Sequence, residues 1–184
     1  MGQYYLPVVK NSKGEFKTFY AHQYDHNGLK LMEHSWNGNN FVAAVLNELL
    51  KNPCSLYWLG DYAQDDDFKN SDSMLTKEQR DKLGVDETLY VTPTEENQIW
   101  VYSKSFIINL TKKEYIQLNK LIDDWDVCPV PILTSVGNGR GLGDYRGVNE
   151  DKAGIWAGDT ILVSKTCEYP DFINKTEEYY FEKC

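Results

Sequence analysis

The segment from residue 137 to residue 147, Gly-Asn-Gly-Arg-Gly-Leu-Gly-Asp-Tyr-Arg-Gly, concentrates groups that bind anions. It holds five of the thirteen glycines and two of the three arginines of the chain. Successive glycine N–H groups can surround an anion, and a guanidinium donates paired hydrogen bonds to phosphate or carboxylate. We therefore predict a non-catalytic site for a small anionic, nucleotide-like ligand. The residues expected to line it are Asn138, Gly139, Arg140, Gly141, Gly143, Asp144, Tyr145, Arg146, Asp61, Tyr62, His34 and Trp156.

A purely structural role for this segment is also open. Glycine costs roughly 0.5–1 kcal/mol more to order than alanine, and Arg140 or Arg146 can offset that cost by pairing with Asp144 or another acid. The segment lacks the Gly-Lys-Ser/Thr ending of a P-loop, and no helix is expected directly after it, as a dinucleotide fingerprint requires. No particular cofactor is indicated. Trp58, Tyr62, Tyr145 and Trp156 are candidates for stacking on the ligand.

The tetrapeptide Leu-Gly-Asp-Tyr occurs twice, at residues 59–62 and 142–145, and residues 157–159 (Ala-Gly-Asp) echo it. If each copy follows a strand, Asp61 and Asp144 lie close together at one end of the sheet. Two such carboxylates can bind a metal or ribose hydroxyls, or share a proton. Gly-Asp is also an ordinary turn dipeptide, and this interpretation stays open.

All three histidines lie within thirteen residues, at His22, His26 and His34. Their spacing matches no zinc-binding motif, so we predict no metal site. His34, which follows a glutamate and precedes a serine, is the candidate general base or polar anchor. A small hydrolase using His34 with Asp61 or Asp144 is therefore one alternative function.

The net charge of −9 argues against general nucleic-acid binding, which requires clustered Lys and Arg. The acid is concentrated in residues 61–72 and 123–126, and such runs are either solvated or able to dock on a basic protein. An acidic inhibitor or adaptor of a host effector is the other alternative. No apolar run is long enough to span a membrane, and the N-terminus and four scattered cysteines favour a reduced, cytoplasmic protein.

The hydrophobic pattern predicts where these residues are positioned. A helix is expected over residues 41–50, and capping-box patterns at 76–79 and 111–114 predict two more. Extended runs are expected at residues 4–10, 15–20, 28–32, 54–59, 98–103, 106–110, 132–133, 155–164 and 178–181. Strands outnumber helices without regular alternation. The predicted fold is therefore α+β, a single domain over residues 1–184 with a mixed or mainly antiparallel sheet and two or three helices.

Several segments resemble a group of bacterial and phage-borne hypothetical proteins. They are residues 28–35 (GLKLMEHS) with Gly38-Asn39, 58–63 (WLGDYA), 137–145 (GNGRGLGDY) and 156–159 (WAGD). The resemblance covers most of the chain and implies a shared fold and site, but supplies no catalytic residues. A mobile-element setting implies a counter-defence role, in which the protein sequesters a nucleotide signal or blocks a host effector.

Overall fold

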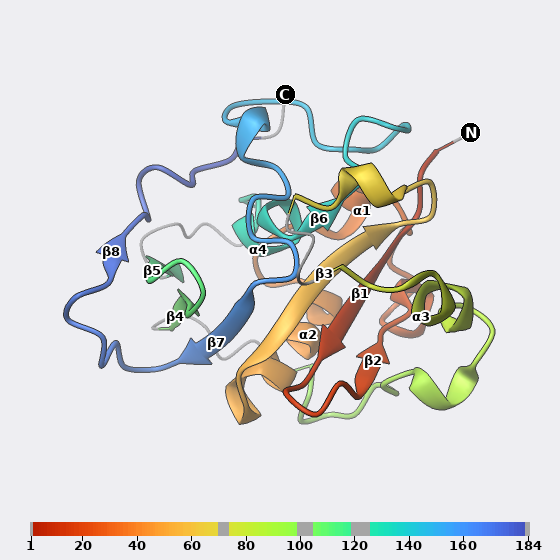
Figure 1. The fold of residues 1–184 in the computed structure, drawn as a ribbon, viewed down its shortest axis with the longest axis horizontal. Coiled ribbons are helices and arrows are strands. Elements are labelled where there is room, and N and C mark those ends of the chain that lie inside the picture. The colour runs from red at the N-terminus through yellow and green to blue at the C-terminus, as the bar shows by residue number, and fades with distance from the viewer. Residues whose placement is uncertain (1, 70–73, 99–104, 119–125, 183–184) are drawn as a thin grey trace.

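A mixed sheet of mainly antiparallel strands forms the framework of the molecule (Figure 1). The computed structural model describes residues 2–69, 74–98, 105–118 and 126–182. Within these ranges the strands are β1 (Tyr5–Lys10), β2 (Phe16–Thr18), β3 (Cys54–Gly60), β4 (Phe106–Asn109), β5 (Glu114–Gln117), β6 (Ser135–Val136), β7 (Thr160–Ser164) and β8 (Ile173–Asn174). The α-helices are α1 (Leu31–His34), α2 (Asn40–Lys51), α3 (Lys77–Lys82) and α4 (Pro129–Leu133). The α+β class predicted from the sequence is confirmed, and the described ranges hold four α-helices where two or three were predicted.

Strand order across the sheet is β2-β1-β3-β7-β4-β5-β8, and β6 pairs with β3. β3 is apolar along most of its length and lies near the centre, antiparallel to β1 and, at its first residues, to β7. β6 runs parallel to the last part of β3. Because parallel strands end at the same edge of a sheet, the loops that follow Gly60 and Val136 leave the sheet together. These loops carry the first Leu-Gly-Asp-Tyr copy and the glycine segment.

The larger core lies between the sheet and α2. Asn39 caps this helix by accepting hydrogen bonds from the backbone N–H groups of Phe41 and Val42, as its sequence predicts. The apolar face of α2 is fully buried against strand residues that include Tyr5 and Val9. Successive side chains of a strand point to opposite faces, so Leu6 and Val8 of β1 face the other side of the sheet.

A smaller apolar cluster covers that second face, beneath α3 and the segments that flank it. Its buried members include Val8, Tyr57, Phe68 and Leu75. α3 begins with the predicted capping box, in which Thr76 Oγ1 accepts a hydrogen bond from the N–H of Gln79, at 3.2 Å, and Gln79 Oε1 accepts from the N–H of Thr76, at 3.0 Å. α3 lies beside β1 in Figure 1, at the margin of the sheet. This arrangement leaves part of the second face uncovered.

The helix predicted behind the second capping-box pattern is wrong, because residues 110–113 form the turn of a hairpin between β4 and β5. Lys113 has a φ of 57°, a left-handed conformation that ends any helix and suits a hairpin turn. Glu114 then accepts hydrogen bonds from two buried aromatic side chains. These tertiary contacts override the local helix signal.

Two segments predicted as extended are short helices instead. Residues 31–32 of the expected strand 28–32 belong to α1 (Leu31–His34), at whose start Glu33 Oε2 accepts a hydrogen bond from the backbone N–H of Lys30, at 3.1 Å. Residues 132–133 belong to α4, whose first residue is Pro129, a residue with a φ that suits a helix start. The hydroxyls of Thr134 and Ser135 donate to carbonyls of α4, which satisfies groups that the helix end leaves free.

The remaining differences concern strand limits. The run 155–164 becomes a strand only from Thr160, since residues 154–158 form turns in which Gly158 has a φ of 80°. Residues 178–179 lie in a turn and 180–181 have no regular structure, so no strand forms there, and β8 is the edge strand. The prediction for 98–103 lies outside the described residues apart from Gln98. Among the described residues, no helix is long and apolar enough to cross a bilayer, and Cys54, Cys128 and Cys167 are free thiols.

Candidate functional site

The amide groups of the glycine segment surround an internal carboxylate. Asp144 Oδ2 accepts hydrogen bonds from the backbone N–H groups of Gly139, at 2.7 Å, and Gly141, at 3.0 Å. Asp144 Oδ1 accepts from the hydroxyl of Tyr5, at 2.9 Å. The side chain of Asp144 is buried, so these contacts are shielded from water. An external anion at these amides would have to displace Asp144.

Gln3 joins the two loops that carry the repeated tetrapeptide. Its side-chain amide donates to the carbonyl of Gly137, at 2.8 Å, and to Asp144, at 3.3 Å, while its Oε1 accepts from the backbone N–H of Tyr62, at 3.3 Å. Gln3 is fully buried between them. The prediction that the two Leu-Gly-Asp-Tyr copies lie together at one end of the sheet is confirmed.

The two aspartates of the repeat nevertheless have different surroundings. Asp61 is exposed, and its Oδ1 accepts a hydrogen bond from the backbone N–H of Tyr4, at 2.9 Å. Asp144 is buried among donors instead. Burial, together with the Asp144 carboxylate, raises the pKa of Tyr5 well above its usual range, so its hydroxyl stays protonated and donates. Asp61 therefore serves as a turn residue, and Asp144 serves as an internal hydrogen-bond acceptor that anchors the loop.

Two glycines are required where the loop closes around Asp144. Gly139 has a φ of 104°, which side-chain-bearing residues rarely adopt. A Cβ on Gly141 would lie 2.6 Å from the backbone nitrogen of Gln3, which is too close for any other residue. The glycine content therefore follows from close backbone packing around the carboxylate.

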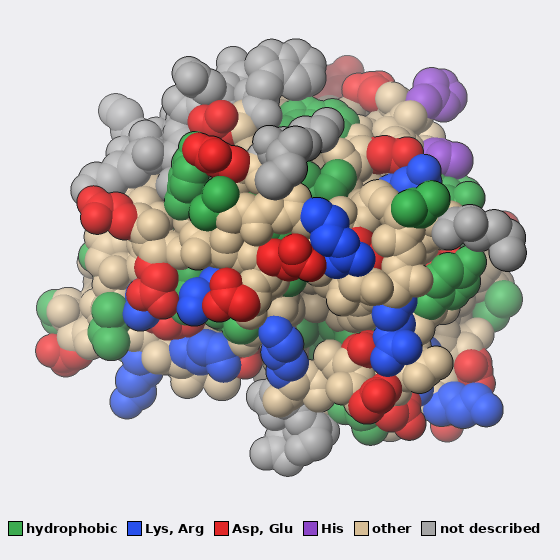
Figure 2. Space-filling view, turned by 90° about the horizontal axis from the view of Figure 1, so that it is seen from above, with side chains coloured by type: hydrophobic (Ala, Val, Ile, Leu, Met, Phe, Trp, Pro, Cys, Tyr) green, Lys and Arg blue, Asp and Glu red, His purple; other side chains and the backbone are tan. Residues whose placement is uncertain are grey.

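Both arginines of the segment form ion pairs within the chain. Arg140 Nε lies 2.5 Å from Asp67 Oδ2, and its Nη2 lies 3.4 Å from Asp66 Oδ1. Arg146 Nη1 lies 2.9 Å from Glu150 Oε1. The acidic run that includes Asp66 is thus partly neutralised by the glycine segment. Figure 2 shows the same mixture, with acidic and basic side chains interspersed over the face seen from above.

A pocket of about 520 Å³ lies beside these ion pairs. It is lined by two basic side chains, Lys69 and Arg146, and by four acidic ones, Asp66, Asp67, Glu150 and Asp151. Lys69 Nζ donates to the carbonyl of Ala153, at 2.7 Å, and burial lowers the pKa of Lys69. The excess of carboxylates makes this pocket unfavourable for an anionic ligand.

Asn138 and Tyr145 hold the two ends of the segment together. Asn138 Oδ1 accepts a hydrogen bond from the N–H of Tyr145, at 2.8 Å, and its amide donates back to the carbonyl of Tyr145. Tyr145 is fully buried, and its hydroxyl contacts the carbonyls of Val148 and Glu182. Its ring is therefore unavailable for stacking on a ligand.

His34 lies in the core, where both ring nitrogens have partners. Trp58 Nε1 donates to His34 Nε2, at 2.8 Å, and because an indole N–H only donates, the ring proton must be on Nδ1. Nδ1 then donates to the carbonyl of Gly28, at 2.9 Å. Burial lowers the pKa of His34 from 6.5 to about 4. The His34 ring is fully buried and neutral, and both of its nitrogens are hydrogen-bonded within the core, so it cannot reach a substrate. We therefore assign His34 neither as a general base nor as a ligand contact.

Trp156 is likewise a fully buried core residue, so its ring cannot stack on a ligand. Its Nε1 donates to Glu114 Oε1, at 2.5 Å, and Tyr179 donates to the same oxygen, at 2.9 Å. The two rings meet edge to face, with centroids 5.6 Å apart. Trp156 and Glu114 thus attach the C-terminal segment to the sheet.

A larger hollow, a groove of about 1100 Å³, lies on the second face of the sheet. Leu6 and Leu59, a cross-strand pair of β1 and β3, form part of its floor. Tyr4, Tyr20 and Tyr90 lie along it. Its other lining residues are Tyr5, Gln23, Leu29, Gly60, Asp61, Ala63, Lys77, Arg80, Asp81, Leu83, Gly84, Glu87 and Thr92.

Sequence reasoning missed this groove, apart from Asp61. Its residues come from β1, β3, α3 and the segment around Tyr90, and no spacing along the chain joins them. The exposure of the Tyr4 ring, beside a buried strand, is a feature that the sequence does not reveal. Tyr62, a predicted ligand contact, is also partly exposed at the end of β3.

Comparison with known proteins gave no match: no family model, curated protein or solved structure is significantly similar to the chain. The resemblance to phage-borne proteins and the role it implies therefore stay predictions. Among the described residues, no group of three or more His, Cys, Asp or Glu side chains is arranged to hold a metal ion.

Proposed function

We propose that this chain is a non-catalytic binding protein whose ligand lies in the groove between the β1–β3 face and α3. The single observation that carries the proposal is the groove itself, a hollow of about 1100 Å³ with Leu6 and Leu59 on its floor and tyrosines along it. Ligand clefts typically occupy 300–1,000 Å³ and combine apolar walls with a few polar groups. The groove is slightly larger than that range.

The tyrosines support a binding role over an enzymatic one. Tyr20 and Tyr90 pack edge to face, with ring centroids 6.2 Å apart, and Tyr4 is 48% exposed. Tyrosine supplies a large contact area with a polar tip, and it is enriched in the residues that dominate protein interfaces. This chemistry favours the adaptor or inhibitor function among those that the sequence predicts.

The other predicted functions receive less support from the contacts. The hydrolase would need His34, whose ring nitrogens are both used in the core. The anionic ligand would need amides and guanidinium groups that Asp144, Asp66, Asp67 and Glu150 already occupy. We therefore assign the glycine segment to holding the end of the sheet and the groove to binding.

The proposal is tested by nuclear magnetic resonance with labelled protein and a defined panel of nucleotides, drug-like fragments and short peptides. We expect the compounds that bind to shift backbone amides of Leu6, Leu59 and Leu83. Shifts confined to residues 137–147, or an absence of binding by every compound, would contradict the proposal.

A further inference from the structure

The groove is lined by basic and acidic side chains, and one of its two basic side chains, Arg80, is engaged within the protein. Arg80 pairs with Asp65, donates to the carbonyl of Leu75 at 2.6 Å, and lies over the ring of Phe68 at 5.4 Å from its centroid. Its side chain is 18% exposed. Of the basic groups along the groove, Lys77 makes no ion pair with other described residues.

The acidic groups of the groove are exposed and uncompensated. Asp61, Asp81 and Glu87 line it, and none of them forms an ion pair with another described residue. Glu87 lies close enough to Tyr90 to contribute, after burial and Tyr20, to raising the pKa of that tyrosine. Three carboxylates and one ammonium group, that of Lys77, therefore line the groove without an ion pair to another described residue, on a chain whose net charge is −9. A cationic occupant is favoured over an anionic one.

The backbone beside the groove does not offer an open strand edge. β2 pairs with β1 only from Val8 onward. Before that point, Tyr5 donates its N–H to the carbonyl of Leu29, at 2.8 Å, and the carbonyl of Pro7 accepts from Thr18 Oγ1, at 2.9 Å. Pro7 itself has no N–H. An occupant is therefore recognised by its side chains and not by adding a strand to the sheet.

We propose that the groove takes an extended peptide segment of a partner protein, in which basic side chains alternate with apolar or aromatic ones. This inference rests on the proposed function. The apolar side chains lie on the floor made by Leu6 and Leu59, between the tyrosines, and the basic side chains reach Asp81 and Glu87. The partner is thus identified by its chemistry, which complements both the floor and the charge of the groove.

The test uses three hexapeptides that share leucine and tyrosine and differ in two positions, which are both lysine, both glutamine or both glutamate. We expect the lysine peptide to bind the full chain about tenfold more tightly than the glutamate peptide at low salt. The difference should narrow as salt is added, because exposed charges are screened. Calorimetry gives the dissociation constants, and amide shifts at Leu59 and Leu83 locate the peptide.

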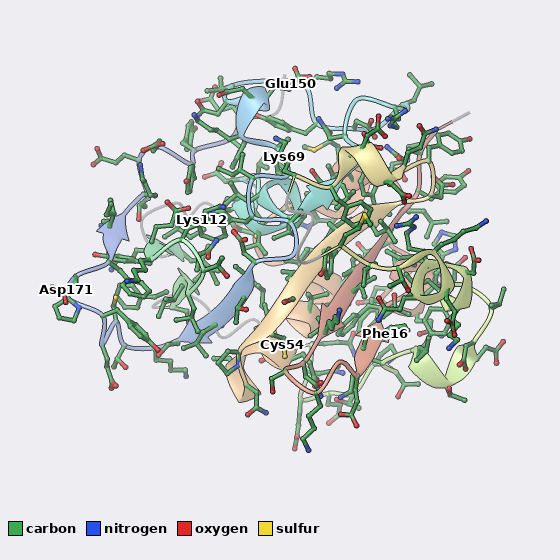
Figure 3. All side chains as sticks on the ribbon, in the orientation of Figure 1. Phe16, Cys54, Lys69, Lys112, Glu150 and Asp171 are labelled. Carbon is green, nitrogen blue, oxygen red and sulfur yellow. The ribbon has the colours of Figure 1, made fainter. Side chains whose placement is uncertain are left out.

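Charge-reversal variants supply the matched comparison. The double variant Asp81→Lys with Glu87→Lys should abolish or reverse the preference for the lysine peptide, because both side chains are exposed and stabilise no described ion pair. Asp171→Lys makes the same kind of change beside β8, at the far side of the molecule from α3 (Figure 3), and should leave the preference unchanged.

Different failures have different meanings. Equal binding of the three peptides in the groove, preference for the glutamate peptide, or tighter binding of a single-stranded oligonucleotide would overturn the peptide inference and leave the groove as the binding site. Binding that shifts no groove amide, or no binding by any of these probes, would overturn the proposed function as well.

Discussion

Replacing Asp144 by alanine should be among the most destabilising single changes at the sheet end. The change leaves the buried hydroxyl of Tyr5 without its acceptor, while the amide of Gln3 keeps the carbonyl of Gly137. A buried donor left unpaired costs about 1–3 kcal/mol, and the hydrogen bonds that the amides of Gly139 and Gly141 donate to the carboxylate are lost as well. We therefore expect a loss of roughly 3–5 kcal/mol in the free energy of unfolding.

The repeated tetrapeptide provides the control, because Asp61 occupies the same sequence context. Its carboxylate is exposed and accepts one hydrogen bond, from the N–H of Tyr4. Asp61→Ala should cost about 0.5–1.5 kcal/mol. For a chain of this size, thermal melts should show a fall of roughly 6–20 °C for Asp144→Ala and far less for Asp61→Ala.

Two results would refute this reasoning. Equal losses in the free energy of unfolding for the two variants would mean that Asp144 is not an internal anchor. An unchanged melting temperature for Asp144→Ala would mean that the loop amides do not depend on Asp144, which would again favour an external ligand for them. Asp144→Asn keeps the shape and removes the charge, so it should melt between wild type and Asp144→Ala. This variant extends the test if the alanine variant does not fold.

Three further predictions concern the other charged and titrating groups. His34, with its pKa lowered from 6.5 to about 4, takes up a proton on unfolding, so stability should fall by roughly 3 kcal/mol as the pH drops from about 6.5 toward 4; an imidazolium signal from its ring at pH 6 would contradict this. Arg140→Met should lower the melting temperature more than Arg146→Met, because Arg140 joins segments 73 residues apart and Arg146 pairs four residues along the chain; the reverse order would show that the segment does not depend on the Asp66–Asp67 contacts. Glu114→Gln should speed proteolysis within residues 165–182, since Trp156 and Tyr179 share its carboxylate; unchanged cleavage would exclude Glu114 as their anchor.

The parts of the fold that local sequence determines were predicted well. α2 has an apolar face and an Asn39 cap, α3 has its own capping box, and β1 with β3 are continuous apolar runs. Each of these signals agrees with its tertiary surroundings. At residues 111–114 the same capping-box signal fails, because Glu114 is required beneath Trp156 and Tyr179. A local pattern does not reveal such a long-range requirement.

The position of the two tetrapeptide copies was predicted from the sequence, but the role of Asp144 was not. The repeat indicated correctly that Asp61 and Asp144 share one end of the sheet. It could not indicate that Asp144 turns inward, because its donors include Gln3 and Tyr5, about 140 residues away in the chain. The groove escaped prediction for the same reason, since its tyrosines come from three separate segments.

The affinity of the lysine hexapeptide for Tyr4→Ala, compared with Tyr180→Ala, tests the central claim most directly. Both tyrosines are similarly exposed, at 48% and 40%, but only Tyr4 lines the groove. If the groove is the binding site, Tyr4→Ala should weaken binding by about five- to tenfold, as removal of an interface aromatic typically does, and Tyr180→Ala should bind as the wild type does. Equal affinities for the two variants would contradict the account.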